Sequence, residues 1–196
     1  MREETKKRRH EAIAEAAYTL LAEKGYDGAS MLSIAKMAKA SNETLYRWYG
    51  DKQGLFRALV QDNAAQIADE LGQAISRNDD PLETLERVAP VFLSMLLGER
   101  AVLLNRAAAS EPTGELGAAL SAGGREVVQP LFKDLMVGIA KGDSAQAEML
   151  TGAFLGLLVG DLQIKRVIGV DSVPTAAQID ARATAALHLF SKLVEK

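Results

Sequence analysis

The chain has 196 residues, of which 48% are hydrophobic and none is cysteine, and its formal net charge is −3. This composition predicts a folded chain, and it excludes a disulfide framework, a thiolate metal site and a cysteine nucleophile. The longest apolar stretch, residues 154–160, is too short to cross a bilayer, and the first residues do not read as a secretory signal. We therefore expect a soluble, cytoplasmic protein.

Charge is distributed unevenly along the chain. Residues 1–60 carry 11 Lys and Arg against 8 Asp and Glu, a net +3, whereas residues 61–196 carry a net −6. Such asymmetry indicates that the first part meets a polyanion. Helical periodicity dominates and no alternating β-branched run occurs, so the sequence predicts an all-α fold of about nine helices.

The first part of the chain predicts a helix-turn-helix. A helix from about Lys6 to Lys24 should end at Gly25. Ser30 and Ser41 then stand where N-caps belong, each ahead of a short helix, and three or four residues separate the two helices. Asp51 should cap a long fourth helix. The expected buried face of the first helix is Ile13, Ala17, Leu20 and Leu21.

The rest of the chain predicts further helices separated by short breaks. Pro81 suits the first turn of the helix that follows the break at 78–80. We expect a loop at 169–174. The expected helices cover 81–96, 99–110, about 115–142, 145–168 and 175–196.

The helix at 42–49 should bury Leu45 and Tyr49, which lie four residues apart on one face. Its other face is polar and aromatic and suits the DNA major groove, where Asn pairs with adenine, Arg with guanine, and Glu accepts from cytosine. The competing interpretation is a solvated or core-packing face, and Trp48 fits either one. The residues expected to contact bases or phosphates are Ser30, Ser41, Asn42, Glu43, Thr44, Tyr46, Arg47, Trp48 and Lys52.

Two groups of cations have separate interpretations. Lys52 lies in the first turn of its helix, where the macrodipole disfavours a cation by about 0.3–1 kcal/mol, so we interpret it as a phosphate clamp. The run from Lys6 to Arg9 is either a solvated face or an arm that touches phosphate or the minor groove.

Residues of about 8–60 resemble the DNA-binding domain of TetR-type transcriptional regulators. The match comprises Ser30, Ile34-Ala35, Thr44-Leu45-Tyr46, Tyr49, Asp51-Lys52 and Leu55, and LYRWYGDKQGLF at 45–56 is similar to the AcrR/AefR-like branch. Lys39 and Glu43 stand where the family often has Gly.

The resemblance implies two helical domains, 1–60 for DNA binding and 61–196 for effector binding and dimerisation. It also implies a homodimer that binds a palindromic double-stranded DNA operator, formed through helices near 144–166 and 175–196. Such proteins are usually repressors released by a small ligand.

No enzyme site is apparent in the sequence. His10 and His188 are isolated, no cluster has metal-ligand spacing, and no nucleophile or nucleotide-binding motif occurs. We expect no cofactor, no metal and no membrane partner. The alternative function is an all-helical small-molecule carrier or enzyme that uses a C-terminal pocket, with the N-terminal helices only structural.

A small hydrophobic effector could bind between helices of the second domain. Each candidate lining residue could instead belong to the core. The candidates are Phe92, Met95, Leu96, Leu103, Asn105, Arg106, Gln129, Met136 and Phe154. The G-x-x-x-G spacings at 152–156 and 156–160 predict close helix packing, plausible across a dimer.

Overall fold

The computed structural model describes residues 2–195, so Met1 and Lys196, the outer limits of the two expected domains, lie outside the described residues. The described residues form helices and no strand, which confirms the all-α prediction. The elements are α1 (Arg2–Gly28), α2 (Met31–Met37), α3 (Asn42–Tyr49), α4 (Lys52–Arg77), α5 (Pro81–Leu97), α6 (Glu99–Ser110), α7 (Glu115–Leu120), the π-helical segment η1 (Ser121–Arg125), α8 (Glu126–Ile139), α9 (Ser144–Val159), α10 (Leu162–Val167) and α11 (Ala176–Val194).

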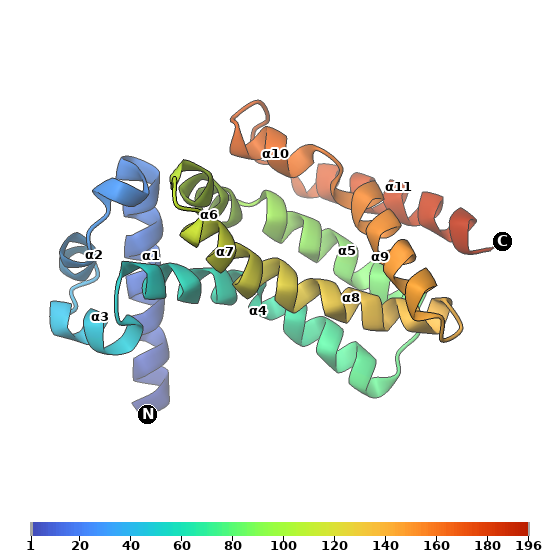
Figure 1. Cartoon of the computed structure of the whole chain (residues 1–196), viewed down its shortest axis with the longest axis horizontal. Helices are drawn as coiled ribbons and strands as arrows, with labels where there is room; N and C mark the ends of the chain where they lie inside the picture. The colour runs from blue at the N-terminus through green and yellow to red at the C-terminus, as the bar shows by residue number, and fades with distance from the viewer. Residues whose placement is uncertain (1, 196) are drawn as a thin grey trace.

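Helices α1, α2 and α3 form a head at one end of the molecule, and α4 leads from this head into the helical body (Figure 1). The helical geometry of α1 is interrupted at Gly25, whose φ of 68° marks the end that the sequence predicts. Ser30 and Ser41 cap α2 and α3 as expected. The expected buried face of α1 is confirmed, because Ile13, Ala17, Leu20 and Leu21 are all buried.

Two of the expected long helices are interrupted, and this raises the number of α-helical segments in residues 2–195 above nine. The prediction of one helix over 145–168 is wrong. The chain breaks at Gly160, whose φ of 50° and ψ of −128° are not helical, and it forms the two helices α9 and α10. The helix expected after Gly114 contains the π-helical turn η1 between α7 and α8. Gly123 in η1 lies against α4, since a Cβ there would come within 3.0 Å of Val60 Cγ1.

The buried side chains form two clusters. In the body, the rings of Phe92, Phe132, Phe154 and Phe190 follow one another, with neighbouring centroids 5.1, 6.0 and 5.3 Å apart. The second cluster fills the head, and it also contains Leu104 and Ala107 of α6 and Leu116 of α7. The head therefore packs on α6 and α7 through a shared apolar core, and the domain limit near residue 60 stays a prediction.

Polar contacts join the same elements. Arg100 of α6 pairs with Glu15 of α1, and its guanidinium lies 5.2 Å from the centre of the Tyr18 ring.

Within the described residues, no single helix has the length and apolarity to cross a membrane, and only the bent pair α5 and α6 reaches that limit together.

Candidate nucleic-acid interface and internal cavity

Helix α3 presents a polar face to solvent while its opposite face is buried. Leu45 is fully buried, as expected, and Tyr49 is half-buried against α1. Glu43, Tyr46 and Arg47 are exposed, with 49% of Tyr46 open to solvent. Their side chains have no hydrogen-bond or ion-pair partner among the described residues, so they are available to an external ligand. Asn42 and Trp48 are half-buried at the edges of this face.

The serine and threonine side chains at the starts of α2 and α3 form hydrogen bonds within the chain. Ser41 Oγ accepts from the Thr44 backbone N–H at 3.1 Å, and the Thr44 hydroxyl lies 2.8 Å from Ser41 Oγ. Thr44 is buried, which differs from the open side chain that a phosphate contact needs. Ser30 and Ser33 form a reciprocal capping box at the start of α2. These residues position α3, and direct contact of Ser30, Ser41 and Thr44 with DNA stays a prediction.

The Lys52 ammonium contacts the end of α1 in the head. Its Nζ donates a 2.8 Å hydrogen bond to the Tyr26 carbonyl oxygen and lies 4.0 Å from the centre of the Tyr26 ring. Both contacts favour the cation in its unfavourable place at a helix N-terminus. Burial lowers the pKa of Lys52. The amine thus fastens α4 to the end of α1, and its role as a phosphate clamp stays a prediction.

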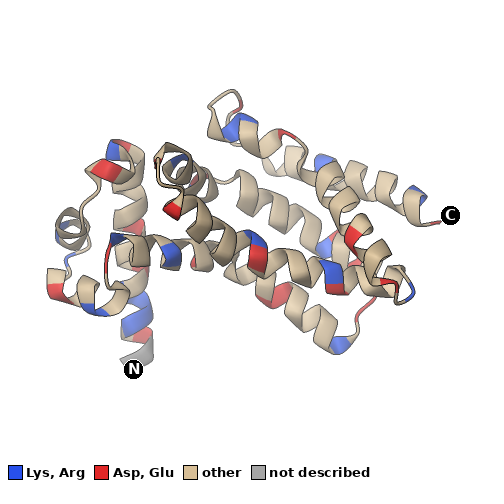
Figure 2. Cartoon of the chain, in the orientation of Figure 1, with Lys and Arg blue, Asp and Glu red and all other residues tan. Residues whose placement is uncertain are grey.

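The basic run of α1 lies beside α3. Lys6 to Arg9 are exposed, and Lys6 Nζ lies 6.0 Å from the centre of the Trp48 ring. Figure 2 shows these cations near the N-terminal end of α1, on the same side of the molecule as α3. The Trp48 ring is therefore part of the contact between α1 and α3, and the basic run extends the positive surface next to the polar face.

His10 is not isolated, contrary to expectation. Its Nδ1 lies 2.7 Å from the Tyr49 hydroxyl at the end of α3, and its Nε2 pairs with the carboxylate of Asp62 on α4. Burial, with a smaller contribution from the Asp62 carboxylate, raises the pKa of Tyr49 to about 12. This chain of contacts links α3 to α4 through α1. No sequence pattern predicts these contacts, because Asp62 is 52 residues from His10.

The turn between α2 and α3 uses a residue with positive φ. Lys39, which stands where the TetR-type family often has Gly, has a φ of 52°. The left-handed region costs a residue with a Cβ about 1–2 kcal/mol. The turn therefore keeps the geometry that Gly would give, at a cost in conformational energy.

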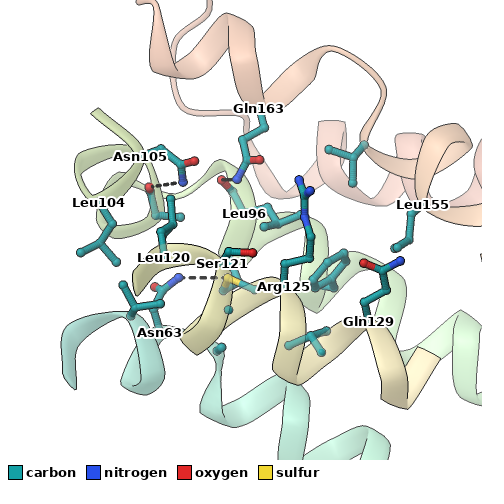
Figure 3. Close-up of a pocket in the computed structure, with 18 of the residues that line it drawn as sticks. Asn63, Leu96, Leu104, Asn105, Leu120, Ser121, Arg125, Gln129, Leu155 and Gln163 are labelled. Carbon is teal, nitrogen blue, oxygen red and sulfur yellow. Dashed lines mark hydrogen bonds between the residues drawn. The ribbon is translucent and has the colours of Figure 1, made fainter. Parts of the chain in front are cut away.

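The body contains an open cavity of about 470 Å³, which is within the usual range for small-molecule sites. The residues that line the cavity come from α4, α5, α6, α7, η1, α8, α9 and α10, and most of these residues are apolar. Polar groups enter at a few places: Asn63, Asn105 and Gln163 on one set of helices, and Arg125 and Gln129 on the other (Figure 3).

Five of the nine expected lining residues face this cavity: Phe92, Met95, Leu96, Asn105 and Gln129. The other four do not line it. Met136 and Phe154 are fully buried in the core, and Leu103 packs against the cluster of the head. Arg106 instead donates to the carbonyl oxygens of Val167 and Arg166 and so holds α10.

Sequence reasoning missed Asn63, Arg125 and Gln163. A usable signal existed for Arg125, because it lies three residues before buried Val128 and four before Gln129, and such residues share a helix face. The described residues hold no group of three or more His, Cys, Asp or Glu side chains that could bind a metal ion.

Comparison with known proteins agrees with these features. The family model described as "Bacterial regulatory proteins, tetR family" matches residues 13–59. An uncharacterized HTH-type transcriptional regulator, YdeS, of Bacillus subtilis is 49% identical over 59 residues, which are 30% of this chain and 28% of that protein. The HTH-type transcriptional repressor AcnR of Corynebacterium glutamicum is 33% identical over 61 residues, 31% of this chain and 32% of that protein.

Solved structures are similar over nearly the whole chain. The crystal structure of a TetR transcriptional regulator from Agrobacterium tumefaciens is 28% identical, with a TM-score of 0.70, and the match covers 94% of this chain and 93% of that one. The chain spans less than a third of the lengths of the regulators YdeS and AcnR that it matches.

Proposed function

Since the chain belongs to the TetR family of bacterial regulatory proteins, we propose that it is a ligand-responsive transcriptional repressor that binds a palindromic operator as a homodimer. The relatives named above are transcriptional regulators, not enzymes, and one of them is named as a repressor. A cytoplasmic location and the AcrR/AefR-like branch remain parts of this proposal.

One observation carries the proposal: the exposed face of α3 holds Glu43, Tyr46 and Arg47 with no partner in the described chain, while Leu45 anchors the helix from behind. A helix held this way can enter the major groove and present its polar side chains to base edges. Arg47 would read a guanine, and Tyr46 would contact a phosphate. The basic run at Lys6–Arg9 would add attraction that does not depend on sequence.

The homodimer would form through the faces of α9, α10 and α11 that point away from the core. Large apolar side chains there are open to water, including Met149 at 64%, Ile168 at 63% and Leu193 at 54% exposure. These exposed apolar side chains support an interface in this region. Small residues at Gly152 and Gly156, both exposed on α9, would let a partner helix approach closely.

Helix α4 would transmit the effector signal. Its residues Val60, Asn63 and Ala64 line the cavity, and between them Asp62 pairs with His10, which contacts Tyr49 on α3. A ligand that moves α4 therefore acts on α3 through two side-chain contacts, Asp62 with His10 and His10 with Tyr49. The coupling free energy required is modest, typically about 1–3 kcal/mol.

The test is selection of random DNA duplexes by the purified protein at physiological salt, followed by sequencing of the retained pool. We expect one palindrome whose half-sites lie about 34–36 Å apart. We also expect retention to fall steeply as salt rises, as phosphate contacts require. Absence of retention at every salt concentration would refute the repressor and leave the carrier that uses the cavity.

A further inference from the structure

The cavity in the body has a single charged side chain. Among the residues that line it, Arg125 is the only ionisable one, and no Asp, Glu, Lys or His accompanies it. The site therefore has a net positive charge at every physiological pH. A cationic ligand would meet repulsion and no counter-charge, whereas an anionic ligand would be attracted.

Arg125 and the neighbouring Gln129 are unpaired. Neither side chain has a hydrogen-bond or ion-pair partner in the part of the chain that the structure describes. Among residues 2–195, seven ion pairs form elsewhere, and the acidic side chain next to Arg125, Glu126, accepts from the Ser121 hydroxyl at 2.9 Å. The two side chains therefore offer a guanidinium fork and an amide N–H₂ to the same space.

The other polar groups of the cavity differ in kind. The amide nitrogen of Asn105 donates to the Ala101 carbonyl oxygen at 2.8 Å, and that of Asn63 lies 3.0 Å from Met95 Sδ. Their carbonyl oxygens stay free to accept. Figure 3 shows these two amides on one side of the view and Arg125 with Gln129 on the other. The apolar walls between them include Phe92, Phe132 and Leu155.

We propose that the effector is an amphipathic monoanion: an apolar body that lies on the phenylalanine rings, with one carboxylate bound by Arg125 and Gln129. A carboxylate matches the planar fork of the guanidinium with two parallel hydrogen bonds. A hydroxyl group at the far end of the body would donate to Asn63 or Asn105. This inference rests on the proposed function, because it names the ligand of the same cavity.

The position of the anion site also explains how binding would reach α4. Arg125 ends the π-helical segment η1, and Gly123 in that segment touches Val60 of α4. π-Helical turns within α-helices are frequent at functional sites. A carboxylate that draws Arg125 into the cavity pulls on η1 and so on its contact with α4.

The experiment compares three probes that share one apolar body: 4-phenylbutyrate, 4-phenylbutanamide and 4-phenylbutylamine. Binding of each to the full-length protein is measured by calorimetry at neutral pH. We expect the carboxylate to bind most tightly and the amine most weakly. Equal affinity for the carboxylate and the amide, tightest binding of the amine, or no binding of any probe would overturn the proposal.

Variants assign the preference to Arg125. Because the guanidinium is partly exposed to water, Arg125→Gln should weaken carboxylate binding by about five- to tenfold, and it should leave amide binding within about twofold. Arg125→Lys keeps the charge without the fork and should lie between. Arg87→Gln, which removes an exposed arginine outside the cavity, is the matched control and should change neither affinity. A carboxylate preference that survives in Arg125→Gln would also overturn the assignment.

The same protein separates this inference from the repressor. If the carboxylate is preferred and Arg125 is required, but no duplex is retained in the selection, the anion site stands and the repressor fails. If a palindrome is retained but the carboxylate and amide bind equally, the repressor stands and the anion site fails.

Discussion

The head and the cavity place their functional groups in opposite ways. In the head, Ser41 and Asp51 cap helices, and the groups free to bind a partner lie on the outer face of α3, such as Arg47. In the body, the free groups lie around a hollow instead, because Arg125 and Gln129 line the apolar cavity and are themselves exposed to solvent. In both regions the fold pairs the polar groups that it needs for its own geometry. Each of the two surfaces keeps an arginine, Arg47 or Arg125, without a hydrogen-bond or ion-pair partner among the described residues.

The largest effect should come from a change at the proposed dimer surface on α9, α10 and α11. Leu189→Glu combined with Leu193→Glu places two charges on the exposed apolar face of α11, and each would be buried without a partner in a dimer. We expect the protein to become monomeric in analytical ultracentrifugation while its helical circular dichroism is unchanged. Operator affinity should fall by about a hundredfold or more, since a single head makes half the contacts.

A matched variant separates this effect from surface charge alone. Leu32→Glu adds a charge at a similarly exposed leucine of the head, outside α9 to α11, and should leave the protein dimeric. A double α11 variant that still sediments as a dimer would place the interface elsewhere and remove that part of the proposal.

A second variant acts on the packing of the head. Leu45→Ala removes a fully buried side chain behind the reading face, and such changes cost about 2–5 kcal/mol. Urea denaturation should show a loss of about 3 kcal/mol in the free energy of unfolding. Hydrogen exchange should rise in α6 and α7 as well as in α1 to α3, because Leu104 and Leu116 share this core. Faster exchange confined to α1–α3 would mean that the head unfolds independently.

The outer face of α3 gives a smaller and sequence-dependent effect. Arg47→Ala should lower affinity for the preferred operator by about 1–3 kcal/mol and relax the choice at one base pair. Tyr46→Phe keeps the ring and removes the hydroxyl, so it should weaken all sequences to the same extent. Repeating the duplex selection with both variants distinguishes them. A uniform loss of affinity with Arg47→Ala would make this residue a phosphate contact.

Much of the head could be read from the sequence because its signals are local. A cap and the N–H that it binds lie within three residues, as for Ser41 and Thr44, and Leu45 and Tyr49 share a face by helical spacing alone. The contacts that the sequence did not reveal are long-range. Lys52 contacts Tyr26 across 26 residues, and nothing in the dipole argument favoured that partner over a phosphate.

The cavity was harder to predict for the same reason. Apolar residues on several helices can fill a core or line a hollow, and the choice depends on how the helices cross. Phe92 lines the cavity whereas Phe154, of the same type, is fully buried in the core. The break at Gly160 places Gln163 of α10 at the cavity. The sequence of α9 or of α10 taken alone does not predict this position.

A double-mutant cycle tests whether α4 and α3 are coupled through His10. Asp62→Asn and Tyr49→Phe each remove one end of the contact chain, and both are conservative in shape. We expect the two changes to be non-additive in operator affinity by about 1 kcal/mol, measured with the same duplex. Strictly additive losses would show that the two contacts are independent. Asp69→Asn, on an exposed part of α4 outside the chain of contacts, is the control.

The smallest effect concerns the turn that sets the angle between α2 and α3. Lys39→Gly relieves about 1–2 kcal/mol of left-handed strain but adds about 0.4–1 kcal/mol of entropy to the unfolded chain. The free energy of unfolding should therefore rise by about 0.5 kcal/mol, measured by urea denaturation. Lys39→Ala keeps a Cβ at the same φ, so it should give no such gain, although it removes the same charge. If both variants are equally stabilising, the charge of Lys39 is responsible and its backbone is unstrained. If only Lys39→Gly stabilises the protein, the positive φ at position 39 costs conformational energy. The turn then holds α3 in place although it lacks glycine, the residue that adopts this φ most readily.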